Sequence, residues 1–198
     1  MSIFQLIVVP LHVNLQTNKI KMKKLQLVLC MALMAVMPSR AQQSVAPFEF
    51  EVKAGTNLPL DSESGISNKL GVNLGLESRW NLKRLPMDVG AELYIGSAVR
   101  HAEDDKSLSN RTISLAILSD YQINRGSKVS PFIGLGLGVA NCQQIKGSLG
   151  DEGTTLCIIP RAGVEFARHL RLTLDAHISK KYYSHVGLTI GYSFHSKK

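Results

Sequence analysis

Cysteine, aromatic residues and helical periodicity are all scarce in this chain. Among 198 residues there are three cysteines, one tryptophan and 6% aromatic residues, against sixteen glycines. No helical period of useful length follows Gln42, which argues against a helical bundle. The sequence also lacks a phosphate-binding loop, a nucleophile elbow and any metal-ligand spacing, so we expect no cofactor and no metal. We interpret the single histidines at 101, 169, 185 and 195 as solvated surface residues.

Acidic residues are absent from the first 41 positions. The five basic residues there contribute much of the formal charge of +8, and without them 18 basic residues face 15 acidic ones, a balance of +3. They are Lys19, Lys21, Lys23, Lys24 and Arg40. A balance this small, without a stripe of basic and aromatic residues, argues against a nucleic-acid partner.

Residues 22–41 have the pattern of a signal peptide. Met22-Lys23-Lys24 gives a charged start, residues 25–37 form an apolar stretch, and Ser39-Arg40-Ala41 ends in small residues suited to cleavage near Ala41. The stretch is shorter than the roughly 20 residues of a membrane-spanning helix. Residues 1–21 fit no such scheme, and we interpret them as an unstructured upstream mis-start. Residues 42–198 are then the exported domain.

Eight runs with an apolar residue at every second position follow. They span residues 48–57, 69–82, 87–99, 111–123, 130–141, 156–167, 170–179 and 186–194. Period two indicates strands, and each run is near the roughly 9 to 11 residues that a tilted strand needs to cross a bilayer. The opposite face mixes charges with glycines, as in a crowded barrel interior. Connections also alternate between long and short, as in outer-membrane barrels. A soluble barrel or sandwich is the alternative.

The sequence therefore predicts an all-β fold, an eight-stranded antiparallel up-and-down transmembrane β-barrel. In that order eight aromatic residues fall at the two membrane interfaces. Those at the periplasmic rim are Phe48, Trp80, Tyr121, Phe166, Tyr192 and Phe194, and those at the other rim are Tyr182 and Tyr183.

Three stretches, "PFIGLGLGVA", "PRAGVEFARHLRL" and "HVGLTIGYSF", resemble the small eight-stranded outer-membrane barrels of Gram-negative bacteria. The similarity is to the OmpX and OmpW type, and especially to their Bacteroidetes relatives. It implies an outer-membrane location, contact with membrane lipid and lipopolysaccharide, and insertion by the barrel-assembly machinery. The relatives usually end at the terminal aromatic residue, whereas residues 195–198 follow Phe194 here.

Twelve ionisable residues fall on the predicted inner face. They are Glu49, Glu51, Lys53, Glu77, Arg79, Asp88, Glu92, Asp120, Arg161, Glu165, Arg171 and Asp175. Eight strands enclose only enough space for their own side chains, so these charges must pair with one another. We therefore expect a filled lumen and a non-enzymatic role in surface interaction or envelope integrity, with ligands bound by the long loops. A narrow porin-like channel for small or apolar solutes is the alternative.

Two local features add hypotheses. Cys142 and Cys157 flank the third long loop on the inner face, and in an oxidising compartment they could form a disulfide or remain free thiols. His177-Ile178-Ser179 resembles the motif of outer-membrane lipid A deacylases. There, His177 would activate Ser179 and Asp175 would orient the histidine. Since the alternation turns these side chains inward, an enzyme is a remote alternative.

Overall fold

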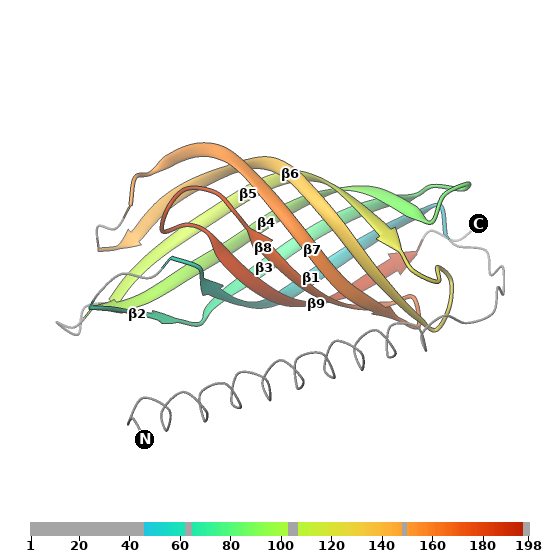
Figure 1. Cartoon of the computed structure of the whole chain (residues 1–198), viewed down its shortest axis with the longest axis horizontal. Coiled ribbons are helices and arrows are strands. Elements are labelled where there is room, and N and C mark those ends of the chain that lie inside the picture. The colour runs from blue at the N-terminus through green and yellow to red at the C-terminus, as the bar shows by residue number, and fades with distance from the viewer. Residues whose placement is uncertain (1–45, 62–64, 103–106, 148–149, 196–198) are drawn as a thin grey trace, which may run out of the picture. The chain divides into compact units, whose positions relative to one another are not determined.

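The computed structural model describes residues 46–61, 65–102, 107–147 and 150–195, which form strands wound around one axis (Figure 1). The strands are β1 (Phe48–Pro59), β2 (Ile66–Lys69), β3 (Gly71–Asn81), β4 (Met87–Ala102), β5 (Ser107–Gln122), β6 (Val129–Lys146), β7 (Gly153–Phe166), β8 (Leu170–His177) and β9 (His185–His195). The predicted signal peptide and residues 1–21 lie outside the described residues. In the described ranges, no helix is long and apolar enough to cross a membrane.

The nine strands close into an eight-stranded antiparallel barrel, because β2 and β3 are two halves of one strand. Lys69 pairs with Val99 of β4 and Asn73 pairs with Gly96, so one extra residue is inserted between them as a bulge near Leu70. The ring runs β3-β1-β9-β8-β7-β6-β5-β4 and returns to β3. The predicted fold class is thus confirmed, including the pairing of the first strand with the last.

The outer face of the barrel is apolar and its inner face is polar, the reverse of the arrangement in a soluble protein. Leu156, Leu70 and Ile117 point outward with 77%, 69% and 67% of their surface exposed, whereas Glu77 and Arg79 are each 1% exposed inside. A continuous apolar surface of this kind is stable only when lipid covers it. The face pattern therefore excludes the soluble alternative.

One end of the barrel carries only short turns, and we call it the turn end. Its connections are residues 82–86, 123–128 and 167–169. The last is a three-residue hairpin loop in which Ala167 and Arg168 have left-handed backbones, with φ of 48° and 65°. Such angles are uncommon outside glycine, asparagine and aspartate, and a bond from His169 N to Phe166 O closes the loop.

The opposite, loop end is more regular than the sequence predicts. The bounds of the fifth and sixth runs predict a loop over residues 142–155, but β6 continues to Lys146 and β7 begins at Gly153. Similarly, β4 reaches Ala102 and β5 starts at Ser107. The backbone ladder continues through polar residues here, where side-chain alternation no longer signals a buried face.

Candidate functional site in the barrel lumen

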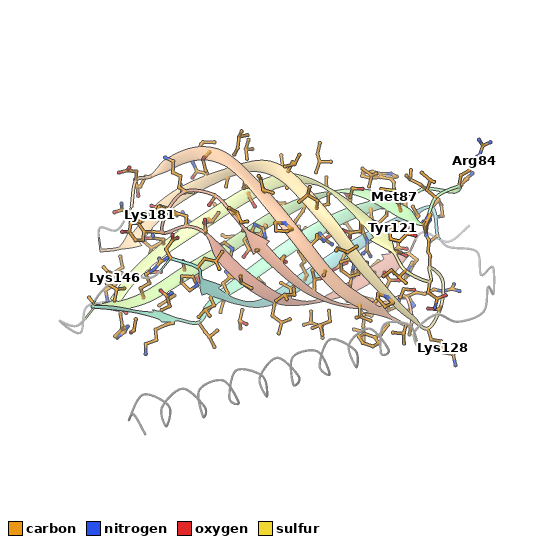
Figure 2. The ribbon with its side chains drawn as sticks, in the orientation of Figure 1. Arg84, Met87, Tyr121, Lys128, Lys146 and Lys181 are labelled. Atoms are coloured by element: carbon orange, nitrogen blue, oxygen red, sulfur yellow. The ribbon has the colours of Figure 1, made fainter. Side chains whose placement is uncertain are left out.

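The inward side chains fill the barrel, and all twelve predicted lumen charges are among them. Each is 7% exposed or less. Figure 2 shows side chains both outside the ring of strands and within its outline. The glycines of this face make room for them: a Cβ on Gly191 would collide with the Glu51 carboxylate, and one on Gly134 with that of Asp120.

Glu77 lies at the centre of the charged network. Arg161 binds both of its carboxylate oxygens at 3.0 Å, and Lys53 and Arg171 each lie 3.4 Å from one oxygen. Lys53 and Arg161 also pair with Glu92. Bidentate pairing of a guanidinium fixes orientation as well as distance, so Glu77 ties β3 to β7 across the lumen.

Arg79 and Arg171 extend the network toward the turn end. The Arg79 guanidinium lies 2.8 Å from Glu49, 3.3 Å from Glu51 and 3.8 Å from Glu165. Arg171 pairs with Asp120, and its guanidinium carbon lies 3.7 Å from the centre of the Phe132 ring. A desolvated cation over a ring face gains additional stabilisation.

The network contains more acid than base. Eight of the twelve residues are carboxylic acids and four are Lys or Arg. Within the described residues, Asp88 and Asp175 have no ion pair with Lys or Arg. Asp88 accepts a bond of 2.8 Å from Gln122, and Asp175 lies 3.6 Å from His177 Nε2.

A second inner layer lies nearer the loop end and includes Tyr94 and Asn57, which the sequence analysis missed. The Tyr94 hydroxyl lies 3.0 Å from Asn57 Oδ1 and 2.7 Å from His185 Nε2. The Tyr94 ring stacks on His177 with 3.9 Å between centroids, and His177 stacks on His185. His185 is fully buried, so its assignment to the solvated surface was wrong. The signal that could have located Tyr94 is its position between the outward residues Leu93 and Ile95.

The segment between β8 and β9 closes the mouth at the loop end. The Tyr182 carbonyl accepts bonds from Arg100 at 2.9 Å and Asn110 at 3.2 Å, and its N–H donates to Asp61 at 2.7 Å. Tyr183 was predicted to be at the membrane interface, but its side chain is fully buried, and burial raises the pKa of its hydroxyl. The interface prediction was wrong for Tyr183 because this loop folds inward.

The aromatic residues predicted at the periplasmic rim lie at the turn end. Trp80, Tyr121, Phe166, Tyr192 and Phe194 are between 41% and 53% exposed on the outer face. Phe48 is partly exposed and packs against Trp80 with 5.2 Å between ring centres. Tyr121 is marked at this end in Figure 2.

Cys142 and Cys157 are both buried free thiols, so the disulfide alternative is wrong. Cys142 faces Gly153 across the β6–β7 ladder, and Cys157 faces Gly138. This offset of four residues corresponds to roughly 13 Å along the strands, whereas a disulfide needs Cα atoms within about 7 Å. The extension of both strands into the predicted loop moved the cysteines out of register.

His177, Ser179 and Asp175 do not form a catalytic triad in the described part of the chain. His177 is 1% exposed within the aromatic stack, and neither of its ring nitrogens has a hydrogen-bond partner among the described residues. Ser179 lies beyond the end of β8 and is only partly buried. No group of three His, Cys, Asp or Glu side chains in the described ranges is arranged to hold a metal ion.

Comparison with known proteins agrees with this architecture. A family model described as "Outer membrane protein beta-barrel domain" matches residues 27–194. Neisserial surface protein A is 12% identical with a TM-score of 0.55, over 78% of this chain and 100% of that one. OprG from Pseudomonas aeruginosa is 12% identical with a TM-score of 0.50, over 77% and 99%. At such identities the likeness concerns the fold alone. A search of curated proteins found no match.

Proposed function

Because the chain belongs to the outer-membrane β-barrel domain family and is located in the outer membrane, we propose that it acts as a closed, non-enzymatic barrel. Its role is in surface interaction or envelope integrity, with the loop end as the contact surface. The observation that carries this proposal is the charged network around Glu77, which fills the cross-section with side chains no more than 7% exposed. Outer-membrane barrels carry short turns on the periplasmic side, so the loop end faces outward.

Planar-bilayer recordings test whether the barrel is closed. The wild-type protein should give no ionic current, because the Arg161 and Arg171 side chains and their carboxylate partners occupy the lumen. The double variant Arg161→Ala, Arg171→Ala removes two long side chains and should show measurable current if it still inserts. The matched control is Arg84→Ala, on an exposed turn. Steady conductance by the wild-type protein would contradict a closed lumen.

The surface role needs a cellular test. A strain without the protein should be compared with strains in which the β1–β2, β4–β5 or β6–β7 connection is shortened. If the loops carry recognition, shortening should reproduce the binding or envelope defect of the deletion while the barrel still inserts. Full function after all three loops are shortened would exclude recognition by them.

One observation supports a second candidate, release of small apolar solutes sideways into the membrane. The β7–β8 ladder runs from Phe166↔Leu170 to Arg161↔Asp175, stops at Pro160, and resumes as a single bridge between Ile158 and Ile178. Proline has no N–H to donate, so this seam is weakened. A hollow of about 370 Å³ lies on the outer face there. Pro160→Val should slow uptake of an apolar dye into proteoliposomes, whereas Pro131→Val, in a continuous ladder, should not. Equal uptake by both variants and wild type would exclude this route.

A further inference from the structure

Among the described strand residues, charge on the outward face of the barrel is confined to one sector. On β1, β7, β8 and β9, every described residue pointing outward is uncharged, whereas Lys69, Arg111 and Lys146 lie on the outward face of β2, β5 and β6. Their register places Lys69 and Lys146 level with each other, three strand spacings or roughly 14 Å apart. Lys69 pairs with Val99, Val99 with Ser109, and Ser109 with Lys146, while Arg111 is two residues further along β5.

Within the part of the chain that the structure describes, the three cations have no partners of opposite charge. None of them forms an ion pair with any described residue. The Arg111 guanidinium donates one bond to Gln143, and its buried Nε has no partner in the described ranges. A guanidinium has five N–H donors, and among the described residues the bond to Gln143 engages one of them.

An apolar hollow adjoins these cations. It has a volume of about 180 Å³, and Val72, Leu74, Ile95 and Ile145 line it together with Arg111. These four aliphatic side chains are between 39% and 68% exposed. The site therefore combines an exposed apolar surface with the guanidinium of Arg111 at one edge.

Arg111 also lies at the membrane depth where lipid headgroups are found. From Tyr121 in the aromatic rim at the turn end, β5 rises ten residues to Arg111, roughly 33 Å along the strand. A strand tilt near 40° reduces this to about 25 Å along the membrane normal, the height of the apolar band of such barrels. In Figure 2 Lys146 lies at the opposite end of the barrel from Tyr121.

We propose that this sector is a binding site for a phosphorylated, acylated glycolipid of the outer leaflet, of the lipid A type. Arg111, with Lys69 and Lys146 above it, binds the phosphate, and an acyl chain lies against Val72, Leu74, Ile95 and Ile145. A guanidinium matches phosphate geometry and is weakly hydrated, which suits it to a site at the edge of the hydrocarbon. The proposal rests on the membrane placement of the barrel and gives the envelope role a molecular contact.

The test is lipid retention by the full barrel in phosphatidylcholine nanodiscs, measured by native mass spectrometry. Added lipid A should bind to wild type, and Arg111→Gln should weaken binding about tenfold. The triple variant Lys69→Gln, Arg111→Gln, Lys146→Gln should abolish it. The matched control is Lys83→Gln, Arg84→Gln, Lys128→Gln at the turn end. Heat-modifiable gel mobility checks that each variant is folded.

Experiments with two other lipids test whether the site recognises the phosphate and the glycolipid. Dephosphorylated lipid A should bind at least tenfold more weakly, and phosphatidylglycerol should not compete at equal charge. Equal binding of dephosphorylated lipid A would overturn the phosphate contact, and equal competition by phosphatidylglycerol would overturn the glycolipid. Binding within twofold of wild type in the triple variant would overturn the whole site. A chain that fails to enter membranes would instead contradict the proposed function.

Discussion

The two halves of the lumen are held together by different forces. Toward the turn end, Arg79, Arg161 and Arg171 bind a group of carboxylates that span several strands. Toward the loop end, Tyr94, Asn57 and His185 form a layer of rings and amides. Removing one partner of a buried ion pair leaves an unpaired charge, whereas removing a neutral donor leaves only an unsatisfied acceptor. The barrel therefore depends more strongly on its charged half.

The largest expected effect follows from Arg161→Met. Arg161 pairs with Glu77, Glu92 and Asp120, so its loss leaves three buried carboxylates short of a cation. We expect the free energy of unfolding to fall by about 3 to 5 kcal/mol. Urea titration of the protein in detergent micelles measures this, with Arg84→Met on the exposed turn as the control. If Arg161→Met lowered the free energy of unfolding by less than Tyr94→Phe does, the barrel would not depend more strongly on its charged half.

Phe132→Leu tests the charged half without removing a charge. The Phe132 ring lies 3.7 Å from the Arg171 guanidinium carbon. Leucine keeps an apolar side chain but loses the ring face, so unfolding should become easier by about 2 kcal/mol. The double variant with Arg171→Met should lose less than the sum of the two single effects. Strict additivity would show that ring and guanidinium do not interact.

Tyr94→Phe tests the neutral half. It removes one hydroxyl that contacts Asn57 and His185 and leaves the ring stack with His177 in place. The expected destabilisation is about 1 to 1.5 kcal/mol, measured in the same urea titration. Tyr192→Phe, on the outer face, is the matched control and should change stability less. A Tyr94→Phe effect near that of Arg161→Met would mean that charge is not what distinguishes the two halves.

The smallest effect is expected at the thiols. Cys142 and Cys157 are free, so a reductant should change neither the unfolding midpoint nor the gel mobility. The double variant Cys142→Ala, Cys157→Ala should behave the same under oxidising and reducing conditions. Cys142 and Cys157 should both react with maleimide after unfolding without reductant. A mobility shift that requires reductant would show a bridge and contradict the register of β6 and β7.

Strand alternation was enough to predict the barrel and the lumen charges. Glu77 and Arg161 could be assigned to the interior because each lies between outward apolar or small residues, Leu76 with Ser78 and Pro160 with Ala162. Pairing partners could not be assigned, because ion pairs across a lumen depend on register and barrel tilt. Arg161 and Glu77 are 84 positions apart, and no local pattern connects them.

The errors lie at strand ends, where side-chain polarity no longer reports the inner face. The disulfide hypothesis was wrong because β6 and β7 extend beyond the apolar pattern. The interface prediction for Tyr183 was wrong because the 178–184 segment folds into the mouth of the barrel. The direction of such a loop depends on contacts such as that of Arg100 with the Tyr182 carbonyl. The left-handed backbone of Ala167 and Arg168 also has no sequence signal, because neither residue type favours it.

The seam between β1 and β9 has a consequence for the order in which the molecule is built. It joins the earliest and latest strands of the barrel, and the Ser193 hydroxyl reaches Glu51 across 142 positions. Contacts this distant in sequence close slowly, so the seam should form last. Until β9 has been made, β1 and β8 present open edges ready to pair with another chain. A truncated chain that ends before His185 therefore cannot close its own barrel, and its open edges can pair with neighbouring chains.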